Sequence, residues 1–153
     1  MRKTGVNAIS VRLYSIYGPY EEPTRLVPTL VKLGLQGKLP PLVSPETARD
    51  FVYVDDAVDA LVSLAQSPAH PSAVYNLCSG VQTSIAFVIE TARKLMNIAA
   101  EPVWSSMERR SWDTDIWVGS PAKMEKEIGW RCRIDFPAGL QRMIDWVQAN
   151  PSQ

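Results

Sequence analysis

Segments of apolar residues alternate with stretches of helical periodicity along the chain. A short apolar run at 51–54 is long enough for one buried strand, and apolar residues then recur every three or four positions from 56 to 65. The same succession appears elsewhere. We predict strands at 6–17, 49–54, 73–78, 103–104 and 116–118, and helices at 26–35, 56–65, 83–96, 121–128 and 136–147. This alternation indicates an α/β or α+β layer architecture.

Polar residues and glycines at the segment ends predict where the helices begin and end. The Asp55–Asp56 pair is typical of a helix N-cap that also interacts with the helix dipole. Thr83 or Ser84 caps the next long helix, and Ser120 is expected to cap the helix that follows, with proline in its first turn.

Composition and charge exclude several classes of function. The 153 residues are 46% hydrophobic and 21% charged, which is enough for one globular core, and sixteen basic residues balance sixteen acidic ones. We therefore expect no nucleic-acid or membrane partner, and no apolar run approaches the roughly 18 residues that span a bilayer. Residues 1–6 lack the apolar segment of a secretory signal, and Cys78 and Cys132 lack metal spacing. A cytoplasmic protein with two free thiols is expected.

Catalytic and metal-binding clusters are missing from the sequence. The single histidine, His70, lies between two prolines, which excludes a Ser/His/Asp triad and leaves no metal cluster. The carboxylates Glu21 and Glu22 precede Pro23 in a turn, and we assign them no role. No residue of the chain is predicted to be catalytic. Arg49 is the strongest candidate for binding, because α/β folds place ligands at strand ends.

Five segments carry motifs in a fixed order: 12–19 (RLYSIYGP), 49–56 (RDFVYVDD), 75–80 (YNLCSG), 110–113 (RSWD), and 128–130 (IGW) with the final helix. Together they resemble the C-terminal half of the NAD-dependent epimerase/dehydratase family, which are extended short-chain dehydrogenases/reductases acting on nucleotide sugars. The resemblance implies an α/β fold, namely the C-terminal part of a Rossmann-like domain with its smaller substrate-binding region.

The family's first half carries a glycine-rich NAD loop and a Y-x-x-x-K catalytic pair, and neither occurs in this sequence. The resemblance therefore implies that residues 1–153 are a substrate-binding half, inactive alone, whose complete enzyme would bind NAD(P). This half alone is not expected to bind the cofactor tightly. The alternative is a free-standing, non-enzymatic module that binds a nucleotide sugar or a partner chain.

The resemblance implies a substrate site formed by Ser15, Leu42, Arg49, Arg110 and Asp113. Arginine suits pyrophosphate because its planar donors bond two oxygens at once, which favours Arg49 and Arg110. Ser15 replaces the family's asparagine and loses one donor. Leu42 either packs on a nucleobase or belongs to the core. Asp113 either accepts bonds from sugar or ribose hydroxyls or pairs with Arg110.

Two alternatives stay open from the residues alone. Arg49 either binds ligand or forms an ion pair with Asp50 or Asp55. Residues 17–19 (Tyr17, Gly18 and Pro19) either lie near the nicotinamide, as the resemblance implies, or simply end a strand in a turn.

The strand at 6–17 has consequences for assembly. If it belongs to a sheet completed by the missing half, its edge is unpaired in this chain. We therefore expect either a partner chain or self-association into a homodimer through that edge.

Overall fold

The computed structural model describes residues 8–67, 73–107 and 114–151 and contains a mixture of helices and short strands. The strands are β1 (Ser10–Leu13), β2 (Ser15–Tyr17), β3 (Ala48–Arg49), β4 (Phe51–Tyr53), β5 (Val74–Leu77), β6 (Thr83–Ser84) and β7 (Ile116–Trp117). The helices are α1 (Leu26–Gly34), α2 (Val54–Gln66), α3 (Ile85–Met96), α4 (Ala122–Ile128) and α5 (Phe136–Ala149). The prediction of an α/β fold is confirmed.

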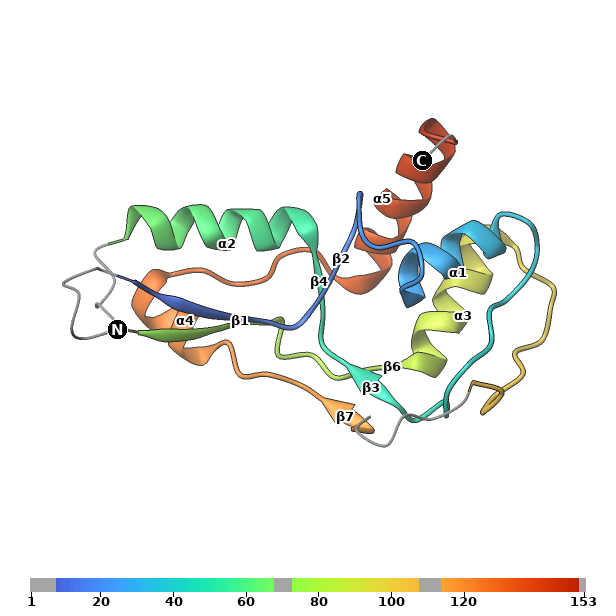
Figure 1. The fold of residues 1–153 in the computed structure, drawn as a ribbon, viewed down its shortest axis with the longest axis horizontal. Coiled ribbons are helices and arrows are strands. Elements are labelled where there is room, and N and C mark those ends of the chain that lie inside the picture. The colour runs from blue at the N-terminus through green and yellow to red at the C-terminus, as the bar shows by residue number, and fades with distance from the viewer. Residues whose placement is uncertain (1–7, 68–72, 108–113, 152–153) are drawn as a thin grey trace.

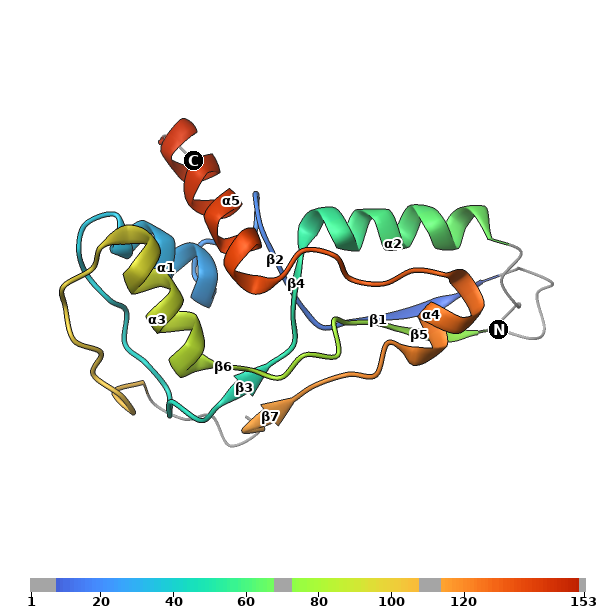
Figure 2. The same cartoon turned by 180° about the vertical axis from the view of Figure 1, so that it is seen from behind.

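The elements gather into two groups at opposite ends of the molecule (Figure 1). Helices α1, α3 and α5 pack on one another at one end, and β1 pairs with β5 at the other, together with α2 and α4. Figure 2 shows the same division from behind. Each group has its own cluster of buried apolar side chains. One cluster centres on Leu30, Val88 and Leu140, and the other on Leu77, Met124 and Trp130.

The predicted strand at 6–17 is divided into two strands with different partners. β1 runs parallel to β5, with Ser10 opposite Val74, whereas β2 runs parallel to β4, with Ser15 opposite Phe51. The change of partner occurs at Tyr14, whose N–H donates to Leu77 O (3.2 Å), while the next N–H donates to Asp50 O (2.9 Å). Apolar patterning alone does not reveal such a change, because both halves are β-favouring.

The prediction that Asp55 and Asp56 cap a helix is wrong. Helix α2 already begins at Val54, and its N-cap position is Tyr53. Asp56 is instead buried and accepts hydrogen bonds from the backbone N–H groups of Arg133 (3.0 Å) and Ile134 (2.8 Å). Asp56 therefore ties the start of α2 to the segment that precedes α5.

Of three further local predictions, one is confirmed and two are wrong. Ser84 caps α3, accepting a hydrogen bond from the N–H of Phe87 (3.2 Å), as predicted. Ser120 does not cap α4, whose N-cap position is Pro121 with no side-chain bond. The expected strand at 103–104 is a loop and turn, since Val103 is exposed and finds no strand partner within the described residues.

Two further findings bear on function. Cys78 and Cys132 are free thiols, as predicted, and burial raises the pKa of each to about 12, so neither is a thiolate at neutral pH. Within the described residues, no helix combines the length and hydropathy needed to cross a bilayer.

Candidate ligand-binding site

A pocket of about 850 Å³ opens between strands β2 and β4 and helices α1 and α3. Its wall is contributed by segments far apart in the sequence: 15–17, 21, 24–27, 29, 40–43, 47, 49, 51, 85 and 107. The volume is that of a small-molecule site, because such sites usually span about 300–1,000 Å³. Three of the predicted substrate residues, Ser15, Leu42 and Arg49, lie on this wall.

The β2–β4 pair sets the geometry of one side of the pocket. Parallel pairing places Tyr17 opposite Tyr53, and the chain then turns at Gly18 with φ of 147°. A Cβ at Gly18 would lie 2.5 Å from Val54 Cγ1, so only glycine fits this turn. Gly18 and Pro19 thus end the strand, while their predicted contact with a nicotinamide stays a prediction.

Tyr17 lies on the pocket wall but is almost wholly buried among aromatic rings. Its hydroxyl donates to Phe136 O (3.2 Å), and its ring contacts Phe51, Tyr53 and Phe136 edge-on or tilted. Burial raises the pKa of this hydroxyl well above its usual value. Tyr17 therefore stays neutral and cannot serve as a general base.

Arg49 is held at the pocket wall by backbone carbonyls. Its NH1 donates to Ala48 O (2.9 Å), Thr114 O (2.9 Å) and Asp115 O (3.4 Å). Within the described residues, no hydrogen bond is formed by its Nε or NH2. The alternative ion pair with Asp50 or Asp55 does not form among these residues, because Asp50 binds backbone groups and Asp55 pairs with Arg142 (3.1 Å).

Asp50 has a structural role that sequence reasoning missed. Its wholly buried carboxylate accepts hydrogen bonds from Ser79 N (2.7 Å), Ser79 Oγ (2.7 Å), Gly80 N (3.0 Å) and Gly119 N (3.1 Å). The position of this acidic residue between Arg49 and an apolar strand was the sequence signal that could have indicated its structural role. Asp50 therefore fixes three segments beneath the pocket and holds the strand that carries Arg49.

The other predicted substrate residues differ in what the structure says of them. Ser15 is half-buried, and its N–H bonds Asp50 O, which leaves its side chain on the pocket wall. Leu42 is 1% exposed and belongs to the core as well as lining the pocket, so its two alternatives are not exclusive. Arg110 and Asp113 lie outside the described residues.

Glu21 and Arg25 line the pocket, although sequence analysis assigned neither a role there. Glu21 Oε1 lies 2.9 Å from Arg25 Nε, and the two side chains are 12% and 58% exposed. Glu21 Oε2 is buried and has no hydrogen-bond partner among the residues that the structure describes. Burial raises the pKa of this carboxyl to about 7, although Arg25 opposes the rise. The four-residue spacing was the signal that could have linked them.

The arrangement suits an anion attached to an apolar or flat group. Arg49 and Arg25 provide donors, while Leu42, Val43 and Ile85 provide apolar wall. Within the described residues, no group of three or more His, Cys, Asp or Glu side chains is placed to hold a metal ion. The expectation that this chain alone binds a dinucleotide cofactor only weakly stays a prediction, based on the lack of a glycine-rich phosphate loop in the sequence.

The chain is similar to known proteins over nearly all of its length. A family model described as "NAD dependent epimerase/dehydratase family" matches residues 1–78. Over 151 residues the chain is 24% identical to an Arabidopsis thaliana trifunctional UDP-glucose 4,6-dehydratase/UDP-4-keto-6-deoxy-D-glucose 3,5-epimerase/UDP-4-keto-L-rhamnose-reductase, covering 98% of the chain and 22% of that protein. It is 27% identical to the dTDP-glucose 4,6-dehydratase of Streptomyces antibioticus, covering 97% of the chain and 44% of that enzyme.

Solved structures also match this chain over about half of their own length. The Bordetella bronchiseptica enzyme WbmF in complex with NADH matches with a TM-score of 0.84 and 27% identity, covering 99% of the chain and 48% of that protein. UDP-glucose 4-epimerase of Thermotoga maritima with UDP-glucose matches with a TM-score of 0.88 and 22% identity, covering 99% and 49%, which shows the fold alone. The chain thus spans half or less of the length of these relatives.

Proposed function

Because the chain belongs to the NAD-dependent epimerase/dehydratase family, we propose that its pocket binds the nucleotide-sugar substrate of such an enzyme. The observation that carries this proposal is Arg49, which is fixed through NH1 on the wall of a pocket of about 850 Å³. The ligand class is supported by WbmF, which is 27% identical and has a solved structure with NAD+ and UDP, and by the dTDP-glucose 4,6-dehydratase of Streptomyces antibioticus.

The proposed roles follow the chemistry of each side chain. Arg49 binds the pyrophosphate, because a planar guanidinium bonds two anionic oxygens at once. Ser15 donates one hydroxyl bond to the ligand, and Leu42 packs against the nucleobase. Arg110 is proposed to join Arg49 on the pyrophosphate, and Asp113 to accept bonds from sugar or ribose hydroxyls.

The chain is proposed to be the substrate-binding half of the enzyme, with catalysis dependent on a part that this sequence lacks. Bound NAD(P) would supply hydride acceptance from the sugar in the complete enzyme. The residues of this chain bind and orient the sugar, and Tyr17, Gly18 and Pro19 lie where the nicotinamide would approach. Without the NAD loop and the Y-x-x-x-K pair, the chain alone is proposed to be inactive and to bind NAD(P) weakly.

The exposed strand β1 supports a proposed partner. One edge of β1 pairs with β5, and the other has no strand partner within the described residues. Leu13 of β1 is 55% exposed. We propose that this edge takes a strand from the remaining part of the enzyme or from a second copy in a homodimer. The balanced charge and two free thiols support a cytoplasmic location.

The test is calorimetric titration of the chain with UDP-glucose, dTDP-glucose and UDP. We expect measurable binding, and we expect Arg49→Ala to weaken it by about 2–4 kcal/mol because a desolvated charge partner is lost. Arg142→Ala is the matched control, since Arg142 is exposed and pairs with Asp55 outside the pocket. Equal affinity in wild type and Arg49→Ala would make Arg49 structural. NAD-dependent turnover by the chain alone would overturn the proposed inactivity.

A further inference from the structure

The two side chains of the Glu21–Arg25 ion pair differ in their exposure to solvent. The carboxylate is 12% exposed and lies beneath the turn that leads into α1, whereas the guanidinium is 58% exposed. Arg25 is bonded through Nε. Within the described residues, no bond occupies its terminal nitrogens. Glu21 therefore fixes the orientation of a guanidinium whose remaining donors stay available at the pocket wall.

The position of this pair along the pocket differs from that of Arg49. Ser15 lies opposite Phe51, two residues beyond Arg49, and β2 then runs away from it toward Tyr17. Each strand residue advances the chain by about 3.3 Å, and Glu21 follows the turn at the far end of β2. Both arginines nonetheless line the same pocket, so their guanidinium groups can meet one anionic ligand.

The carboxylate of Glu21 is poorly stabilised in its charged form. Oε2 is buried without a hydrogen-bond partner, and burial raises the pKa of the group to about 7. Arg25 is the charged side chain that opposes this effect. Other residues on the same wall add no charge. Tyr17 stays neutral, and Thr24 and Thr29 have no ionisable group. Arg25 and, less strongly, a backbone hydrogen bond with Gly18 thus favour the charged form of Glu21.

We propose that Glu21 is a positioning residue that holds Arg25 for the anionic part of a nucleotide sugar and becomes partly protonated as that ligand binds. An anion at Arg25 neutralises the cation that stabilises the carboxylate and also repels the carboxylate directly. The proton comes from solvent and adds to the unpartnered Oε2, which converts Glu21 into a neutral acid. This inference rests on the proposed function.

The experiment is titration calorimetry of the whole chain with UDP-glucose in two buffers of different ionisation enthalpy, at several pH values from 6 to 9. The buffer dependence of the heat gives the number of protons taken up. A rise of one unit in the pKa of Glu21 predicts uptake of about half a proton near pH 7.5 and an affinity that falls about tenfold across this range. Glu21→Gln is expected to take up none and to bind with pH-independent affinity.

Glu22→Gln is the matched control, because Glu22 is the exposed neighbour and bonds only Thr24 Oγ1 among the described residues. It should take up protons as the wild type does. Arg25→Gln provides a second variant, and it should also abolish uptake. Binding by the wild type without proton uptake, or uptake retained in Glu21→Gln, overturns the inference and leaves the proposed function standing. Absence of UDP-glucose binding in every form overturns both.

Discussion

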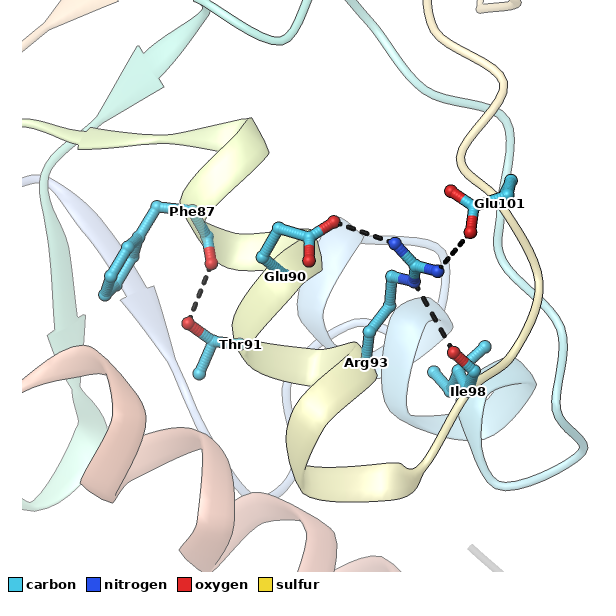
Figure 3. A network of polar contacts seen from close by, with 6 residues as sticks. All are labelled: Phe87, Glu90, Thr91, Arg93, Ile98 and Glu101. Atoms are coloured by element: carbon cyan, nitrogen blue, oxygen red, sulfur yellow. Dashed lines mark hydrogen bonds and ion pairs between the residues drawn. The ribbon is translucent and has the colours of Figure 1, made fainter.

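Two regions of the molecule use arginine in opposite ways. At the C-terminal end of α3, Arg93 lies between Glu90 and Glu101 and also reaches the carbonyl of Ile98 (Figure 3). All three guanidinium nitrogens are engaged, at 3.0 Å to Glu90, 2.7 Å to Glu101 and 3.4 Å to Ile98 O. These hydrogen bonds to carboxylates raise the pKa of Arg93.

In the pocket, each arginine is only partly engaged within the described residues. Arg49 uses NH1 on backbone carbonyls, and Arg25 uses Nε on Glu21. A guanidinium has five N–H donors, so these two retain donors that a planar anion can accept from. We infer from this difference that engagement of its donors, more than exposure, separates an arginine that holds a helix end from one that is proposed to bind a ligand.

The largest effect is expected beneath the pocket. Asp50→Ala leaves four donors without their acceptor and frees the segment that carries Arg49. We expect the free energy of unfolding to fall by about 3–5 kcal/mol, as for breaking a buried charged network. Urea denaturation followed by circular dichroism measures this. Asp59→Ala, at an exposed position of α2, is the control and should change stability little. Similar stability of the two variants would show that Asp50 is not the structural centre of the site.

A smaller effect is expected at the fully engaged arginine. Arg93→Ala removes two carboxylate contacts and one carbonyl contact, and should lower the free energy of unfolding by less than Asp50→Ala does, with a smaller loss at high salt. Affinity for UDP-glucose should stay unchanged, because Arg93 does not line the pocket. A loss of affinity as large as that of Arg49→Ala would remove the distinction between the two regions.

Sequence pattern predicted the helices better than the strands and the long-range polar contacts. Periodicity located α3 and α5, because their apolar stripes are local properties of the chain. The same reasoning misread Asp56 as a cap, since its partners Arg133 and Ile134 lie far away in sequence. It likewise gave Glu21 no role, because a buried, unpartnered oxygen is a property of packing that no spacing reveals.

The smallest expected effect is the pH dependence of the free energy of unfolding that arises from Glu21. Folding raises the pKa of Glu21 from 4.5 to about 7, so the native state binds this proton more tightly than the unfolded chain. The free energy of unfolding therefore falls as pH rises from about 4.5 to about 7 and is constant above.

Glu21→Gln keeps an acceptor for Arg25 but loses the titration. We expect the variant to gain on the wild type with increasing pH, reaching on the order of 1 kcal/mol at pH 8, which partial solvent contact keeps small. Urea denaturation at pH 5, 6, 7 and 8 gives the difference, with Glu22→Gln as the control. A difference that does not change with pH would show that Glu21 keeps an ordinary pKa. Its carboxylate would then stay charged and pair with Arg25 as Glu90 and Glu101 pair with Arg93.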